Sequence, residues 1–375
     1  MNPSQAFLII FLLNLSYRIV CGQTDDDIIW SDMQSFGDRN RSSFSTYGSG
    51  TWSQIVSCAS SSGFNDTDLG SFSKDRSRYC NRECRRGPCC APRSPAELDV
   101  KFRHFSIGNE VRLLDWRNKD DVQYLGNNKV VFIIDGWLRK FSPKSWTVKV
   151  KDVFLNGSSD YSSVVIVDWG SRHGFLYNQA IQDVRVVGAM IGKAILNWNI
   201  SDRTLLVGMS LGGQIISEAG RFTQENGNGS RIKECHALDP AGPNFDSCSV
   251  RLTKSDCQVV QVIHTNGQHS SIKFQLGSGV KSGHCDYWIN CGFDQECSGM
   301  RTCSHRHAIY VYFSNLRRLC DYQAYPCPDC GAKTKNCLVV DQEANSSNVS
   351  PFLVCTPDSD LNFFVASDVT KRPYC

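Results

Sequence analysis

The cysteines of this 375-residue chain are numerous and unevenly placed. Of the 19, one stands at position 21, five lie between positions 58 and 90, and thirteen lie from position 235 onward. The chain therefore divides into a cysteine-rich N-terminal part, a long cysteine-free centre and a cysteine-rich C-terminal part. If Cys21 is removed with a signal peptide, 18 cysteines remain, and this even number allows up to nine disulfides in a secreted chain.

Two further patterns indicate export from the cell. Residues 1–22 contain the ten-residue apolar run Ala6–Leu15, followed by small residues near Gly22 that suit signal-peptidase cleavage. Seven Asn-x-Ser/Thr sequons follow, as expected of an extracellular glycoprotein. They lie at Asn40, Asn65, Asn156, Asn199, Asn228, Asn345 and Asn348.

Charge and hydropathy exclude two classes of protein. Forty basic and 37 acidic side chains give a net charge of +3, without the concentrated basic face typical of a nucleic-acid-binding protein. Beyond the N-terminus, no apolar run approaches the roughly 18 residues that a transmembrane helix needs. We therefore expect neither a nucleic-acid partner nor a transmembrane span.

Composition divides the mature chain near residue 93. Residues 23–93 are rich in Ser, Asp, Gly and Arg and end in four closely spaced cysteines, so they can bury little apolar surface unaided. We interpret them as a small disulfide-stapled extension or a propeptide. Residues 94–375 are predicted to form the main domain.

Short β-branched runs and one long amphipathic segment predict the fold of that domain. Buried strands are expected at 129–134, 163–168, 204–207 and 259–264. Between the second and third, residues 177–198 carry apolar side chains at helical spacing. Strands that alternate with helices predict an α/β protein with a central, mostly parallel sheet.

The sequence Gly208-Met-Ser-Leu-Gly212 follows one of these strands and precedes a helix-compatible stretch. A serine on so tight a turn projects its hydroxyl from the end of the sheet, as a nucleophile does. A serine nucleophile needs a histidine base and an orienting carboxylate. Asp239 and His305 follow in the chain order Ser, Asp, His that α/β-hydrolases use.

Six motifs in order resemble the pancreatic-lipase family of α/β-hydrolases over roughly residues 95–370, most closely its short-lid secreted phospholipase A1 members. The motifs lie at 167–169, 208–212, 238–243, 262–265, 283–287 and 303–305. The resemblance implies Ser210 as nucleophile, Asp239 as orienting acid and His305 as base. His307 is the rival for the base, although it falls outside the family's Cys-x-His pattern.

The resemblance also implies an oxyanion hole formed by the backbone N–H groups of Trp137 and Leu211. Two residues depart from the family here. Asp135 stands where the family usually has His, and Met209 stands where it has His before the serine. A carboxylate at position 135 could weaken stabilisation of the oxyanion.

Residues 250–256 resemble the family's calcium-binding loop, but Thr253 occupies a position where relatives have a carboxylate. Calcium prefers several anionic oxygen ligands, and Asp256 alone makes a tight site doubtful. We therefore expect no metal and no other cofactor.

In this family the segment between two cysteines before the catalytic His forms the lid. Here Cys297 and Cys303 enclose only five residues, too few for a covering helix. By similarity, the expected disulfides are Cys297–Cys303, Cys320–Cys327 and Cys330–Cys337. The chain ends about where the hydrolase domain should, so no colipase partner is expected.

These observations predict a secreted serine lipid hydrolase, a phospholipase A1 that releases the sn-1 acyl chain of glycerophospholipids at membrane or micelle surfaces. One alternative is a triacylglycerol lipase or galactolipase of the same family. Another, from a different class, is a non-catalytic lipase-fold binding or storage protein. Such proteins typically lose triad residues, whereas this chain keeps Ser210, Asp239 and His305.

Overall fold

A computed structural model gives the fold of most of the predicted main domain and of part of the extension. It describes residues 63–73, 90–108, 111–157, 160–170, 177–246, 250–267, 275–292, 295, 301–320, 322–327, 330, 350–351 and 355–367. The predicted signal peptide at residues 1–22 and most of the extension lie outside these residues. None of the helices within them is long and apolar enough to span a membrane.

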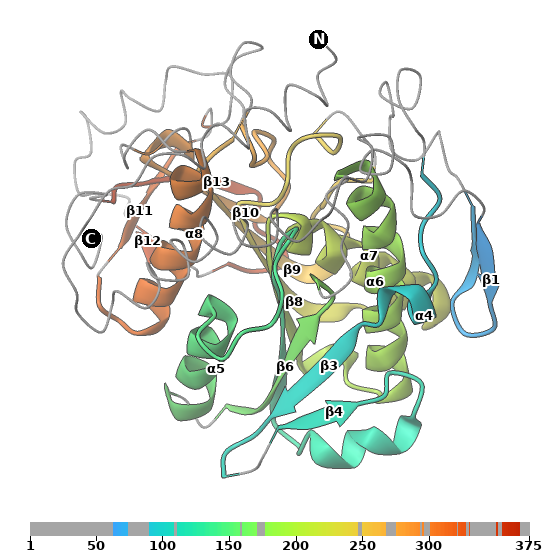
Figure 1. The fold of residues 1–375 in the computed structure, drawn as a ribbon. Helices are drawn as coiled ribbons and strands as arrows, with labels where there is room; N and C mark the ends of the chain where they lie inside the picture. The colour runs from blue at the N-terminus through green and yellow to red at the C-terminus, as the bar shows by residue number, and fades with distance from the viewer. Residues whose placement is uncertain are drawn as a thin grey trace, which may run out of the picture.

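An 11-stranded sheet forms the centre of the protein, in the order β12-β11-β13-β10-β9-β8-β7-β5-β6-β3-β4 (Figure 1). Its seven central strands, β13 to β6 in this order, run parallel, and antiparallel strands complete both edges. The prediction of an α/β fold with a mostly parallel sheet is therefore confirmed.

The four predicted strands are present as β5 (Lys129–Ile134), β6 (Tyr161–Asp168), β7 (Thr204–Met209) and β9 (Cys257–His264). Their β-branched side chains are buried because helices cover both faces of the sheet. The other strands are β3 (Lys101–Phe105), β4 (Arg112–Leu114), β8 (Ile232–Leu238), β10 (Cys285–Ile289), β11 (Gln323–Pro326), β12 (Ser350–Pro351) and β13 (Leu361–Val365).

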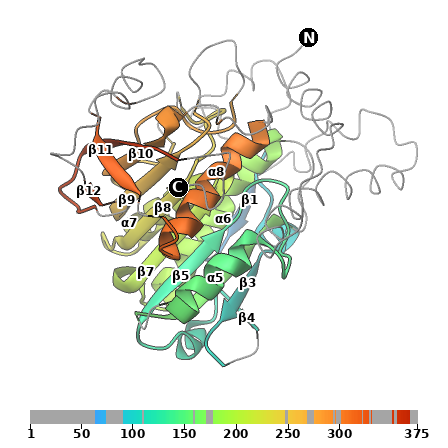
Figure 2. The ribbon, with the colours of Figure 1, turned by 90° about the vertical axis from the view of Figure 1, so that its left-hand side faces the viewer.

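Two layers of helices enclose the sheet. α6 (Tyr177–Asn197) and α7 (Leu211–Asn226) cover one face, and α5 (Trp146–Gly157) and α8 (Arg301–Leu316) cover the other (Figures 1 and 2). The predicted apolar stripe of α6 is buried. Gly188 and Gly192 let α6 approach α7 closely, since a Cβ atom on either would lie 2.9 Å from a backbone oxygen of α7.

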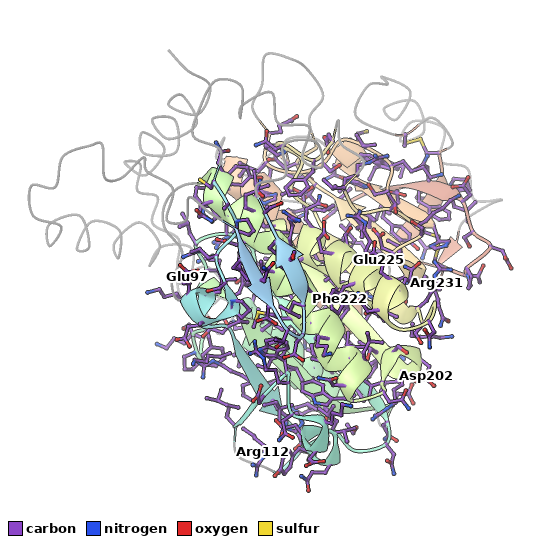
Figure 3. All side chains as sticks on the ribbon, turned by 90° about the vertical axis from the view of Figure 1, so that its right-hand side faces the viewer. Glu97, Arg112, Asp202, Phe222, Glu225 and Arg231 are labelled. Atoms are coloured by element: carbon purple, nitrogen blue, oxygen red, sulfur yellow. A yellow bond between two sulfur atoms is a disulfide. The ribbon has the colours of Figure 1, made fainter. Side chains whose placement is uncertain are left out.

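Part of the predicted extension packs on this domain. The hairpin of β1 (Phe64–Asp66) and β2 (Gly70–Phe72) lies over α6 (Figure 3), and Leu69 and Phe72 belong to the same apolar core as α6 and α7. Further along, Arg93 precedes the short helix α4 (Pro95–Leu98) and binds Asp183 of α6. Within the described residues, the hairpin and the main domain thus share one core.

Three disulfides link described cysteines: Cys235–Cys257, Cys285–Cys355 and Cys327–Cys330. The predicted pairs Cys320–Cys327 and Cys330–Cys337 were therefore wrong. A tight turn, in which the N–H of Cys330 donates to the carbonyl of Cys327 at 3.0 Å, brings these two cysteines together. Cys303 is disulfide-bonded, but Cys297 lies outside the described residues, so the pair Cys297–Cys303 stays a prediction.

Candidate active site

Strand register brings the predicted triad to the edge of the sheet that is formed by the carboxyl ends of its central strands. Ile134 of β5 pairs with Gly208 of β7, and Leu238 of β8 pairs with both Met209 of β7 and Ile263 of β9. The carboxyl ends of these four parallel strands are therefore level. The residues that follow them meet at this edge, where α/β proteins place their ligands.

Ser210 occupies a strained turn between β7 and α7. Its φ of 57° and ψ of −120° lie outside the regions that non-glycine residues normally adopt. The flanking glycines are required, because a Cβ atom on Gly208 would lie 2.3 Å from the carbonyl oxygen of Gly212. Gly212 in turn packs against β5, where its Cβ atom would lie 2.3 Å from the carbonyl oxygen of Ile134. This geometry holds the serine at the end of the sheet, partly exposed.

Asp239 and His305 form a close pair beside it. His305 Nδ1 lies 2.5 Å from Asp239 Oδ2, and both side chains are buried. Since a carboxylate can only accept, the hydrogen bond places the proton on Nδ1 and leaves Nε2 as the acceptor. His305 lies in the first turns of α8, an element that sequence analysis did not predict.

The second oxygen of the Asp239 carboxylate is held by the backbone. Oδ1 accepts hydrogen bonds from the N–H of Thr265, at 2.9 Å, and from the N–H of Asn266, at 3.0 Å. Both donors follow the end of β9. Together with His305 they fix the plane of the carboxylate, so that Oδ2 points at the imidazole.

No hydrogen bond joins Ser210 Oγ to His305 in this structure, although both residues are described. The structure thus brings Asp239 and His305 into contact and places Ser210 at the same edge. Hydrogen bonds of catalytic groups are often long or poorly aligned without substrate.

His307, the rival base, lies elsewhere. It is buried, its Nε2 lies 3.0 Å from the hydroxyl of Ser367, and burial lowers its pKa to about 4. Two positions along an α-helix point in different directions. His307 therefore faces away from Asp239.

The predicted oxyanion loop packs on the nucleophile. A Cβ atom on Gly136 would lie 2.9 Å from Ser210 Cβ and 3.4 Å from its Oγ. Trp137 is thereby placed one residue from this contact, and Leu211 begins α7 directly after the serine. Both residues of the predicted oxyanion hole therefore lie next to Ser210 or to a residue that contacts it.

Asp135, the residue of this loop that departs from the family, is hydrogen-bonded within the loop. Its Oδ1 accepts the N–H of Gly136 at 2.7 Å. Burial raises the pKa of its carboxyl above the ordinary value, and the positive charge of Arg139 opposes this rise. The side chain thus fixes the loop that holds Trp137 and adds a carboxyl group beside the site.

Gly277 is a site residue that sequence analysis missed. A Cβ atom there would lie 2.3 Å and 2.4 Å from the two carboxylate oxygens of Asp239. The other missed groups, the N–H groups after β9, belong to the backbone and leave no side-chain signature. Their one signal was the Val-Ile-His-Thr motif, which ends at the same edge as Asp239.

We expect Gly277→Ala to lower kcat strongly while the protein still folds. The new methyl group cannot fit beside Asp239 unless the carboxylate moves, and a misplacement of about 1 Å in an active site can cost on the order of a hundredfold in rate. Steady-state kinetics with a soluble ester and thermal unfolding would check this. Ser278→Ala is the neighbouring control, and equal kcat values for the two variants would contradict the role assigned to Gly277.

The described residues include no group of three or more His, Cys, Asp or Glu side chains that could hold a metal ion.

Comparison with known proteins gives the family. The family model described as "Lipase" matches residues 66–347. "Lipase member H-A" of Xenopus laevis is 34% identical over 226 residues, 56% of this chain and 46% of that protein. "Pancreatic lipase-related protein 2" of Homo sapiens is 29% identical over 63% of this chain and 55% of that protein.

This chain covers a larger share of the length of a third relative. "Phospholipase A1" of Vespa crabro is 28% identical over 266 residues, which are 65% of this chain and 82% of that protein. The chain spans about half the length of the first two relatives. Because the family match extends over far more than half of the sequence, the chain belongs to the lipase family.

Proposed function

We propose that the protein is a secreted serine hydrolase that cleaves carboxylic ester bonds of acyl lipids. The observation that carries this proposal is the Asp239–His305 pair at the edge of the sheet where the strained turn presents Ser210. A buried carboxylate, an oriented imidazole and a partly exposed serine hydroxyl are the parts that acyl transfer needs.

In the proposed mechanism, His305 Nε2 takes the proton of the Ser210 hydroxyl as its oxygen attacks the acyl carbonyl carbon. The negative charge that develops on the carbonyl oxygen is stabilised by the N–H groups of Trp137 and Leu211. His305 then gives the proton to the leaving alcohol, and an acyl-serine remains. Water, deprotonated by His305, hydrolyses this intermediate and restores the serine.

Asp239 keeps the imidazole in the required tautomer and stabilises the imidazolium that forms in each half-reaction. Its own charge is supported by the two backbone N–H groups on Oδ1.

We infer that the substrate is a glycerophospholipid cleaved at sn-1, as in a phospholipase A1. Two observations support this choice over a triacylglycerol. The relative that the chain covers most fully of those compared is named "Phospholipase A1". In addition, only five residues separate Cys297 from Cys303, which is too short a lid to cover the site.

The test is hydrolysis of phosphatidylcholine that carries distinguishable acyl chains at sn-1 and sn-2. We expect release of the sn-1 chain by the wild-type protein and no release by Ser210→Ala. Tributyrin and a galactolipid, assayed in parallel, separate the phospholipase from a triacylglycerol lipase or galactolipase. A folded wild-type protein that hydrolyses none of these lipids would overturn the enzyme proposal in favour of a lipid-binding protein.

A further inference from the structure

The guanidinium of Arg221 lies at the centre of the loop that resembles a calcium site. Arg221 belongs to the last turns of α7, the helix on which Phe222 and Glu225 are labelled in Figure 3. Its Nη1 donates to the carbonyl oxygen of Val250 at 2.8 Å, and its Nη2 donates to that of Arg251 at 2.5 Å. Its Nε lies 3.3 Å from Asp256 Oδ1. Three oxygens of a single loop therefore surround one cation.

The remaining oxygen of Asp256 is also occupied. Asp256 is 1% exposed, and its Oδ2 accepts the hydroxyl of Ser217 at 2.9 Å and the N–H of Thr253 at 2.8 Å. Burial raises the pKa of the Asp256 carboxyl, and the Arg221 charge acts against this rise. Arg221 is therefore the positive charge that faces this buried carboxyl.

Helix and loop are in close contact at this point. A Cβ atom on Gly220 would lie 2.1 Å from the carbonyl oxygen of Asp256. On its other side, Arg221 Nη1 also lies 3.1 Å from Glu218 Oε1. The guanidinium is thus fixed between two carboxylates and two carbonyl groups.

These residues do not fit the calcium ion that the resemblance implies. Calcium takes about six to eight oxygen ligands at roughly 2.3–2.6 Å. The oxygens of Val250, Arg251 and Asp256 that could contribute already face the nitrogens of Arg221, and a divalent cation among them would meet the guanidinium charge. Thr253, at the position where relatives have a carboxylate, directs its hydroxyl to Ser255 at 2.7 Å.

The loop is connected to the active site through Gln214. The N–H of Leu252 donates to Gln214 Oε1 at 2.9 Å, and Gln214 Nε2 donates to the carbonyl of Ala241 at 2.7 Å. Ala241 is two residues from Asp239, and its own N–H donates to the carbonyl of Ser210 at 3.0 Å. A series of hydrogen bonds therefore runs from the loop to the nucleophile turn.

We propose that Arg221 is an internal cation that holds the loop Val250–Asp256 in the role that calcium has in relatives, so that the protein keeps its fold without a divalent ion. The proposal stands apart from the proposed catalytic function, because it concerns the stability of the folded chain.

The experiment measures the midpoint of thermal unfolding in EDTA and in millimolar calcium chloride. The wild-type midpoint is expected to be the same in both solutions. Arg221→Met is expected to lower it by about 5 °C or more, because it removes the cation beside the buried Asp256 carboxyl and the donor to two loop carbonyls. In Arg221→Met/Thr253→Asp, which exchanges the guanidinium for a second carboxylate, calcium is expected to raise the midpoint.

Arg231 offers a matched control. Its Nη2 donates to the carbonyls of Lys254 and Ser255 in the same loop, at 3.2 Å and 3.1 Å, and the structure gives it no carboxylate partner. Arg231→Met/Thr253→Asp should therefore not respond to calcium. A wild-type midpoint that falls in EDTA and recovers with calcium would overturn the proposal. Because this measurement uses the wild-type protein, it tests the proposal even if a variant fails to fold.

Discussion

Asp239→Asn is expected to reduce kcat for ester hydrolysis by about ten-thousand-fold, the scale of loss seen when a triad acid becomes an amide. The reason lies in the donors around the side chain. The backbone N–H groups of Thr265 and Asn266 both require an acceptor, so the amide oxygen must face them. The amide NH2 then faces His305 Nδ1 and donates to it, which leaves the proton on Nε2, where His305 cannot accept one from Ser210.

Steady-state kinetics on a soluble ester, together with thermal unfolding, would check this prediction. The chain contains a second His–Asp pair that serves as a control, since His264 Nε2 lies 2.8 Å from Asp286 Oδ1 and backbone N–H groups bind that carboxylate too. Asp286→Asn should lower the unfolding temperature but keep kcat within about tenfold of wild type. Similar loss of kcat in both variants would show that the effect of Asp239→Asn is structural.

Asp183→Ala is expected to give the largest loss of stability, about 3–5 kcal/mol, because it leaves a buried guanidinium without its counter-ion. Arg93 contacts the carboxylate of Asp183 through its backbone N–H and Nε, each at 3.0 Å, and through Nη2 at 2.6 Å. The two side chains are 7% and 0% exposed. Burial raises the pKa of Asp183, and Arg93 opposes that rise.

Urea unfolding of Asp183→Ala and of Asp99→Asn, which keeps a residue that tolerates the left-handed backbone at position 99, would measure the effect. Asp99 binds Lys101 at 2.6 Å, but those side chains are 36% and 39% exposed. Water screens such a pair, so its loss should cost less than about 1 kcal/mol. If the two variants unfold at the same urea concentration, the Arg93–Asp183 pair does not anchor the chain ahead of α4 to the domain.

Sequence alone predicted the parts of the fold whose signal is local. β5 and β9 were recognisable as continuous β-branched runs, and α6 by its apolar spacing. β3 and β13 were not, because each has only five residues and becomes a strand only by pairing with β6 or β10, which lie far away along the chain. Propensity carries little information about such non-local pairing.

The candidate site likewise contains residues that the sequence predicts and groups that it does not. Ser210, Asp239 and His305 could be predicted because side-chain chemistry restricts which residues can serve in a triad. The donors that hold Asp239 are backbone groups, and Gly277 contributes by having no side chain. The pair Cys327–Cys330 was missed because cysteine spacing fits several pairings and does not show which sulfurs the fold brings together.

The pairing of β8 with β9 has a consequence for how such a protein can change over evolutionary time. Leu238 pairs with Ile263, so strand register sets the position of the acid relative to its two donors. The Cys235–Cys257 disulfide joins the middle of β8 to the first residue of β9. A slip of one residue would move the donors by about 3.3 Å and turn every side chain to the other face. Loops that contact substrate can therefore lengthen, shorten and diversify without disturbing the acid, provided that these two strands keep their alignment.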